Sequence, residues 1–84
     1  MPVHLTHHVK EKIKLIQKYK FRVSQQTIIN TIYDPVRTEA RSDGTVIATS
    51  LLDEKHVLRV VYKKQNDIII VITCYPGRRK AYGV

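Results

Sequence analysis

Hydrophobic residues in the first part of the chain recur every three or four positions, a spacing that is typical of amphipathic helices. The pattern predicts a first helix from Leu5 to about Lys20, with Thr6 placed to cap its N-terminus. The residues on its apolar face are Val9, Ile13 and Ile16.

A second helix is predicted to begin at Ser24. Val23 and Ile28 flank this serine at the two positions of a hydrophobic staple, with the serine as the N-cap. Asp34-Pro35 is expected to end the helix, because the residue before a proline avoids the helical region. The N-terminal part of the chain is therefore expected to consist of two short helices.

The remaining chain has the pattern of a β-sheet, because apolar and polar residues alternate and turn sequences separate the runs. Asp43-Gly44 is a strong hairpin signal, and residues 65–67 form a second turn sequence. Residues 68–75 are rich in β-branched side chains and are expected to form a central strand covered on both faces. The tail, residues 78–84, is expected to add a short edge segment. The four predicted strands span residues 36–41, 45–51, 55–63 and 68–75.

This order of elements predicts an α+β fold, in which both N-terminal helices pack on one face of an antiparallel sheet of about four strands. The opposite face of the sheet would be partly open, and a ligand could bind there. The chain of 84 residues is expected to form a single domain, residues 1–84.

Composition agrees with a small globular protein, since 43% of the residues are hydrophobic and 26% are charged. The longest aliphatic run, Ile68–Ile72, is far shorter than the ~20 residues of a membrane span. The N-terminus lacks the apolar segment of a secretory signal. The single cysteine, Cys74, excludes an internal disulfide and is expected to be a small buried group rather than a nucleophile. These features predict a cytoplasmic protein without a membrane partner.

The net charge of +8 is concentrated at the two ends of the chain. Residues 1–22 contain six basic residues and a single acid, Glu11, and residues 76–84 contain three basic residues and no acid. Residues 23–75 contain equal numbers of basic and acidic residues. If the fold brings the two ends together, they form one basic surface, as expected of a protein that binds a polyanion. The alternative is that these charges serve only solubility.

A second stripe on the first helix carries His8, Lys12, Leu15 and Tyr19 at spacings of three and four residues. His8 and Lys12 therefore lie one turn apart on the same side, where an imidazole could transfer a proton and a lysine could bind phosphate. The alternative is that both are solvent-exposed surface residues. His4 precedes the expected helix cap, and no carboxylates cluster near the histidines, so neither a metal site nor a cofactor is predicted.

Several short motifs along most of the chain form a pattern. In the C-terminal half these are the run Leu58–Tyr62, an Asn-Asp turn, a β-branched strand, the pair Arg78-Arg79 and Tyr82. In the N-terminal half they are His8-Val9-x-x-Lys12, the helix start at Val23-Ser24 and Asp34-Pro35. Together these motifs resemble the RelE/ParE superfamily of toxins, and the N-terminal ones are similar to those of its small members with a His-Ala-x-x-Arg opening. The resemblance implies the barnase/colicin/RelE-type nuclease fold and a metal-independent endoribonuclease, free or dependent on the ribosome.

Cleavage of RNA through the 2′-hydroxyl needs a base for that hydroxyl, an acid for the 5′-oxygen and cations near the phosphorane. In RelE-like enzymes a strand arginine, a later arginine and a C-terminal tyrosine serve these roles. By resemblance they correspond to Arg59, to Arg78 or Arg79, and to Tyr82. His8 is a second candidate for proton transfer.

The apolar strand neighbours of Arg59 favour an arginine that binds an anion. The alternative is that Arg59 pairs across the sheet with Glu39 or Asp53. Four further residues are candidate RNA contacts, namely Lys12, Tyr75, Arg78 and Lys80.

The sequence thus predicts an RNA-binding, RelE-like endoribonuclease that forms the toxin of a toxin–antitoxin pair. Its expected partners are RNA, free or on the ribosome, and an acidic antitoxin. The alternative is a basic module of the same fold that binds RNA or DNA without cleaving it.

Overall fold

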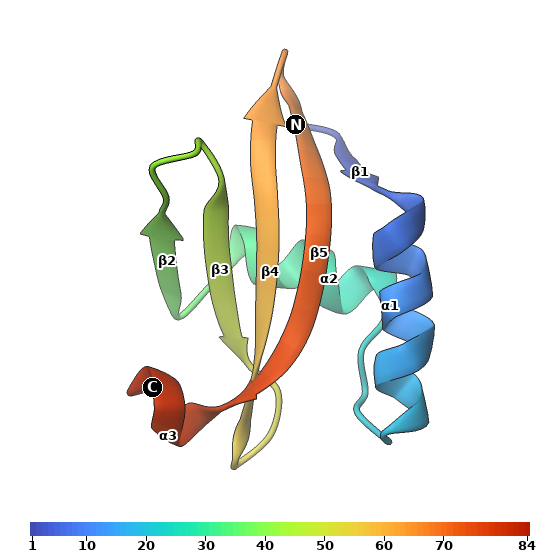
Figure 1. Ribbon diagram of the computed structural model, residues 1–84, viewed down its shortest axis with the longest axis vertical. Helices are drawn as coiled ribbons and strands as arrows, with labels where there is room; N and C mark the ends of the chain where they lie inside the picture. The colour runs from blue at the N-terminus through green and yellow to red at the C-terminus, as the bar shows by residue number, and fades with distance from the viewer.

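Five strands and three helices make up the fold in a computed structural model that describes residues 1–84 (Figure 1). The strands form one mixed sheet in the order β1-β5-β4-β3-β2, so the α+β class is confirmed. The elements are β1 (Val3–Leu5), α1 (His7–Lys18), α2 (Gln25–Tyr33), β2 (Arg37–Ala40), β3 (Val46–Leu51), β4 (His56–Gln65), β5 (Ile68–Arg78) and α3 (Arg79–Tyr82).

Both N-terminal helices begin at the predicted caps. The Thr6 side chain accepts a hydrogen bond from the Val9 amide at the start of α1 and donates one to the Val71 carbonyl of β5. Ser24 and Thr27 form a reciprocal capping box at the start of α2. The helix ends at Asp34, directly before the proline, as predicted. None of the three helices has the length and hydrophobicity needed to span a lipid bilayer.

Antiparallel pairing connects β2 to β3, β3 to β4 and β4 to β5, as the turn sequences predict. The first turn contains Gly44 with a φ of 88°, a conformation that glycine adopts without strain. The β4–β5 turn contains Asn66 and Asp67 with φ angles of 51° and 64°, the positive values that a tight hairpin turn requires.

The sheet differs from the expected antiparallel sheet of about four strands because β1 pairs in parallel with β5. The expected first helix included Leu5, but the cap at Thr6 excludes that residue from α1. Leu5 instead lies in β1, opposite Val71, and its side chain is buried in the core. A strand of three residues is too short to show a clear alternation of apolar and polar side chains.

Two further expectations about the C-terminal region are wrong. The tail forms the short helix α3 rather than an edge segment. β5 lies between β1 and β4 in the sheet, but it is not covered on both faces. Ile69, Val71 and Cys74 are buried, whereas Thr73 and Tyr75 are only partly buried. β5 therefore contributes one face to the core, and its other face is only partly covered.

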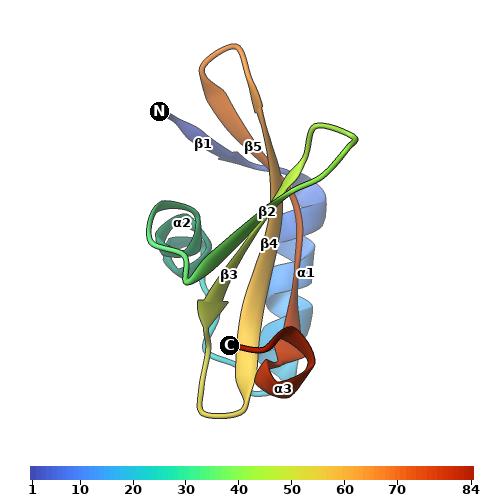
Figure 2. The same cartoon turned by 90° about the vertical axis from the view of Figure 1, so that its left-hand side faces the viewer.

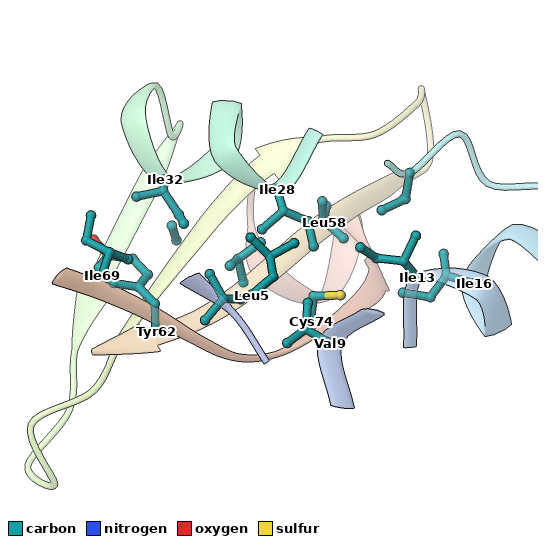
Figure 3. Packing of buried hydrophobic residues seen from close by; sticks show 14 residues of the cluster. Leu5, Val9, Ile13, Ile16, Ile28, Ile32, Leu58, Tyr62, Ile69 and Cys74 are labelled. Atoms are coloured by element: carbon teal, nitrogen blue, oxygen red, sulfur yellow. The ribbon is translucent and has the colours of Figure 1, made fainter. Parts of the chain in front are cut away.

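The core is a cluster of 14 buried side chains drawn from α1, α2 and the sheet (Figure 3). On β4 it includes Leu58, Val60 and Tyr62, so the alternation of this strand directs Arg59 to the other side of the sheet. Figure 1 shows α2 crossing behind the strands and α1 running beside β5. In Figure 2, which views the sheet nearly along its edge, α2 and α3 lie on different sides of the strands.

Candidate functional site

A buried arginine forms the centre of the sheet face opposite the core. Arg59 is only 5% exposed. Its guanidinium donates hydrogen bonds from Nη1 and Nη2 to the two carboxylate oxygens of Glu39, at 3.2 and 3.5 Å, and from Nε to the Tyr75 hydroxyl at 3.3 Å. The Tyr82 ring covers the guanidinium, with its centroid 4.1 Å from Cζ. We call Arg59 and these three partners the Arg59 cluster.

Strand register brings most of this cluster together. Arg59 lies directly opposite Tyr75 on β5 and opposite Thr49 on β3, and cross-strand partners share a face of the sheet. Glu39 lies one strand further, on β2. The alternation of β2, β4 and β5 therefore determines which side chains meet here, although they are far apart in sequence.

The C-terminal helix completes the cluster because the chain turns at Arg78 into α3, which places the Tyr82 ring against Gly77 of β5. A Cβ atom at Gly77 would lie 2.5 Å from a ring carbon of Tyr82, so only glycine permits this close approach. The backbone carbonyl of Tyr82 accepts a hydrogen bond of 2.6 Å from Nη1 of Arg37. Arg37 thus holds α3 against the open face of the sheet.

The charges of Arg59 and Glu39 balance within the cluster, and Arg37 beside it adds one positive charge. Burial acts to lower the pKa of Arg59, but the hydrogen bonds with Tyr75 and Glu39 outweigh it, so that pKa is raised above its ordinary value. Nε of Arg37 lies 3.4 Å from Oε1 of Glu39, so two guanidinium groups share one carboxylate. Thr49 Oγ1, directly opposite Arg59 on β3, is buried and has no hydrogen-bond partner.

The structure brings together only two of the four expected catalytic residues, Arg59 and Tyr82. Arg59, Tyr82 and Tyr75 lie together in the Arg59 cluster. Arg79 does not, because its side chain donates to the backbone carbonyls of Val84 and Glu54. His8 is exposed on α1, and its Nε2 lies 3.2 Å from the hydroxyl of Thr73 on β5.

Arg59 is paired rather than free, and its partner is Glu39, one of the two partners named as alternatives. The other, Asp53, instead contacts His56. The sequence suggests Glu39 only as an ion-pair partner of Arg59. Glu39 also lies two residues after Arg37 in an alternating strand, which places the side chains of Arg37 and Glu39 on one face of the sheet.

Two of the expected RNA contacts, Lys12 and Tyr75, line a shallow groove of about 320 Å³ between α1 and β5. The other residues of this groove are Leu15, Ile16, Tyr19, Phe21 and Pro76. Leu15 is 46% exposed and Tyr19 is 72% exposed, so both side chains are accessible to a ligand in the groove. The groove lies between α1, in the basic N-terminal segment, and Pro76, the first residue of the basic C-terminal segment.

The other two expected RNA contacts, Arg78 and Lys80, are exposed at the end of β5 and in α3. They line a second depression of about 320 Å³ together with Glu54, Lys55 and Arg79. Figure 1 shows the end of α1, the β3–β4 loop and α3 at the same lower end of the molecule. The basic residues at the two ends of the sequence therefore lie at the same end of the sheet, with the strands between α1 and α3 in this view.

Sequence reasoning did not identify a paired aspartate and histidine in the β3–β4 loop. Nδ1 of His56 lies 2.8 and 3.0 Å from the two carboxylate oxygens of Asp53. The backbone amide of Lys55 donates to the same carboxylate, which lowers the pKa of Asp53; burial opposes this, and bonds from His56 add to it. The spacing Asp-x-x-His in a loop is the only signal that the sequence offers.

The remaining candidate groups do not form a site. Cys74 is fully buried, and this burial raises the pKa of its thiol to about 11. The thiol therefore stays protonated at neutral pH, as expected of a buried structural cysteine. No group of three or more histidine, cysteine, aspartate or glutamate residues is arranged to hold a metal ion.

Comparison of the chain with family models, with curated proteins and with solved structures finds no match. The function must therefore be inferred from the chemistry of the Arg59 cluster and of the basic surface around it.

Proposed function

We propose that the protein binds single-stranded RNA along α1 and β5 and cleaves it, without a metal ion, at the Arg59 cluster. In this proposal the fold is RelE-like: the two N-terminal helices pack against the core face of the sheet, and the catalytic residues lie on the opposite face. The observation that carries the proposal is the pair of arginines sharing one carboxylate on that open side, Arg37 and Arg59 around Glu39.

The groove beside α1 supports binding of a single strand rather than a duplex. Its three aromatic residues, Tyr19, Phe21 and Tyr75, offer surfaces on which unpaired bases can stack. Such stacking contributes roughly 1–3 kcal/mol per base and tolerates any sequence. Lys12 lies in the same groove and can pair with a phosphate. Because Tyr75 also touches Arg59, a strand in the groove would lie next to the Arg59 cluster.

The Arg59 cluster and the neighbouring Arg37 contain the base and the cations that transesterification of RNA requires, and the acid would be His8 on α1, outside the cluster. The Glu39 carboxylate can accept the proton of the 2′-hydroxyl, whose oxygen then attacks phosphorus. The two arginines stabilise the negative charge that develops on the phosphorane oxygens. His8 can donate a proton to the 5′-oxygen as the P–O5′ bond breaks. The products are a 2′,3′-cyclic phosphate and a free 5′-hydroxyl.

The substrate must move one side chain before this chemistry can occur. Arg59 is almost completely enclosed, and the Tyr82 ring occupies the side of its guanidinium that a phosphate would approach. This enclosure favours a second candidate function, in which the same surface binds RNA or DNA without cleaving it. Under that alternative the Arg59 cluster is a structural ion pair.

The basic surface also suggests how such a nuclease would be controlled. An acidic protein partner would neutralise the surface by charge complementarity, as an antitoxin does in a toxin–antitoxin pair. The same surface could bind ribosomal RNA and so restrict cleavage to mRNA on the ribosome.

The test is to incubate the purified protein with single-stranded RNA in EDTA, both alone and with translating ribosomes, and to analyse the ends of the products. We expect fragments with 2′,3′-cyclic phosphate ends, and we expect Glu39→Gln to abolish them while RNA binding is kept. Lys63→Gln, on an exposed part of β4, is the control variant. If wild-type protein binds RNA and leaves it intact under both conditions, the non-catalytic alternative is correct.

A further inference from the structure

Two segments that are distant in sequence are joined at the lower end of the sheet. The backbone amide of Arg79, at the start of α3, donates a hydrogen bond of 2.9 Å to the carbonyl of Lys55 in the β3–β4 loop. Figures 1 and 2 both show this loop beside the junction of β5 and α3. Two depressions of about 320 Å³ each share Glu54 and Lys55 as lining residues, and His56 lines one of them.

The imidazole of His56 is held in a defined orientation at this junction. An ionised carboxylate only accepts hydrogen bonds, so the contacts with Asp53 require a proton on Nδ1 of His56. Asp53 is itself fixed by the backbone amides of Lys55 and His56, each at 2.8 Å. The ring of Phe21 packs edge-on against the imidazole, with the centroids 4.8 Å apart. Nε2 makes no hydrogen bond within the protein, so it can act as a donor to a ligand when protonated.

Two cations without ion-pair partners, Arg78 and Lys55, neighbour this imidazole. Arg78 is the direct cross-strand partner of His56, which places their Cβ atoms about 5 Å apart. Arg37, Arg59 and Arg79 all use their side chains in hydrogen bonds, but Arg78 does not. Lys55 is also unpaired, since Lys14 is the only lysine in an ion pair. The nearby acids are Asp53, whose carboxylate is fully engaged, and Glu54.

We propose that His56 and Arg78, with Lys55 beside them, form a binding site for a phosphate group. The planar guanidinium can pair with two phosphate oxygens, and the imidazole can donate a further hydrogen bond from Nε2. A phosphate group of this kind could belong to free phosphate or to the backbone of RNA. The site is separate from the Arg59 cluster and does not depend on cleavage there.

The test is an NMR titration of the full-length protein with inorganic phosphate, with chloride at matched ionic strength as the reference. We expect saturable shifts of the His56 ring and the Arg78 side chain that chloride does not produce. Arg78→Gln should weaken phosphate binding by about tenfold, the usual effect of losing a hydrogen bond to a charged group. Arg41→Gln, at an arginine that is also exposed and lies in the β2–β3 loop, should leave the affinity unchanged.

Asp53→Asn tests the orientation of the imidazole. The asparagine oxygen can still accept from the loop amides, so the loop is kept while the charged contact with Nδ1 is lost. We expect weaker phosphate binding than in the wild type. The proposal is wrong if phosphate shifts the lysines of α1 and the His56 region alike, or if Arg78→Gln binds phosphate as the wild type does.

A second titration with a short single-stranded oligouridylate distinguishes the two sources of phosphate. If the His56 and Arg78 signals respond to both ligands, the site binds the RNA backbone. If they respond to phosphate alone, the site binds a free phosphate, and the proposed RNA binding along α1 is unaffected. A response confined to the groove residues Tyr19 and Tyr75 would support the proposed function and not the phosphate site.

Discussion

Arg59 and Arg78 lie on adjacent strands of one sheet, yet their surroundings are opposite. Arg59 is enclosed by Glu39, Tyr75 and Tyr82 and is only 5% exposed. Arg78 is exposed and uses its side chain in no hydrogen bond or ion pair. The comparison shows that residue type alone does not determine which arginine binds an anion. An enclosed guanidinium is already positioned but must be uncovered, whereas an exposed one is accessible but must be ordered by its ligand.

The two arginines should also differ in what they contribute to folding. A buried charge that loses its partner is costly, because its desolvation is no longer compensated. An exposed cation without a partner contributes little to stability, since water already solvates it. We therefore expect Arg59 to matter for both structure and catalysis, and Arg78 to matter for binding alone. The predictions below test this division of roles.

The largest expected effect is on cleavage. Arg59→Ala should raise the barrier by about 2–4 kcal/mol, the range for removing one preorganised donor to a developing charge. Arg78→Ala should change the cleavage rate of bound RNA little. Single-turnover cleavage of a saturating RNA substrate measures both. If Arg59→Ala weakened cleavage and RNA binding by the same factor, Arg59 would act in binding, as Arg78 does, and the proposed difference in their roles would be wrong.

The next effect is on the free energy of unfolding. Arg59→Ala removes hydrogen bonds to Glu39 and Tyr75 and the contact with the Tyr82 ring, so we expect a loss of about 2 kcal/mol. Arg78→Ala should stay within about 0.5 kcal/mol of the wild type. Chemical denaturation of the two variants under the same conditions gives the comparison. Similar losses in both would show that the enclosure of Arg59 contributes no net stability.

The contact between the Tyr82 ring and Arg59 can be broken by a substitution at Gly77, which lies on the other side of the ring. In Gly77→Ala the new Cβ would meet the Tyr82 ring at 2.5 Å, so the ring must move away. Loss of the contact between ring and guanidinium should cost about 1 kcal/mol of stability. It should also expose Arg59, which faster hydrogen exchange of its Nε–H would detect. Tyr82→Phe keeps the ring and serves as the control, in which slow exchange should persist.

Much of the fold could be predicted from local signals. Thr6 and Ser24 cap helices as expected, and Gly44 and Asn66-Asp67 form the expected turns. β1 and α3 could not be predicted, because each is too short for a periodic pattern. β1 is stabilised by parallel pairing with a strand more than sixty residues away, and α3 by the bond between Arg37 and the Tyr82 carbonyl.

The candidate site was predicted only in part, for a related reason. The alternation of side chains along β4 is visible in the sequence and is enough to put Arg59 on the face opposite Leu58. It could not show that Glu39 and Tyr82 enclose the guanidinium, because that depends on three strands and a helix meeting in space. The pair of Asp53 and His56 was missed because a loop has no periodicity to indicate which side chains meet.

A smaller effect is expected on the salt dependence of RNA binding. Each exposed cation that pairs with a phosphate of single-stranded RNA releases counterions and adds about 0.7 to the slope of log affinity against log salt. Arg78→Ala should lower the slope by about that amount, whereas Arg59→Ala should leave it unchanged while Tyr82 covers the site. Fluorescence anisotropy with labelled RNA at several salt concentrations measures the slopes. A reduced slope in Arg59→Ala would mean that bound RNA already reaches the enclosed arginine.

The smallest effect concerns Asp53, which orients His56, the cross-strand neighbour of Arg78. The amide of Lys55 lowers the pKa of Asp53 below its usual value of 3.8, with burial opposing and His56 assisting. A carboxylate with a lowered pKa in the folded state stabilises the fold above its usual pKa. That stabilisation is lost as the pH falls through the lowered value. The stability advantage of the wild type over Asp53→Asn should therefore be constant near neutral pH and shrink below about pH 4. Denaturation of both proteins across this pH range measures the difference in their free energies of unfolding. A difference that is independent of pH would show that the charge of Asp53 is not what holds the loop.

Arg59 itself provides no such pH dependence, because a guanidinium stays charged throughout this range.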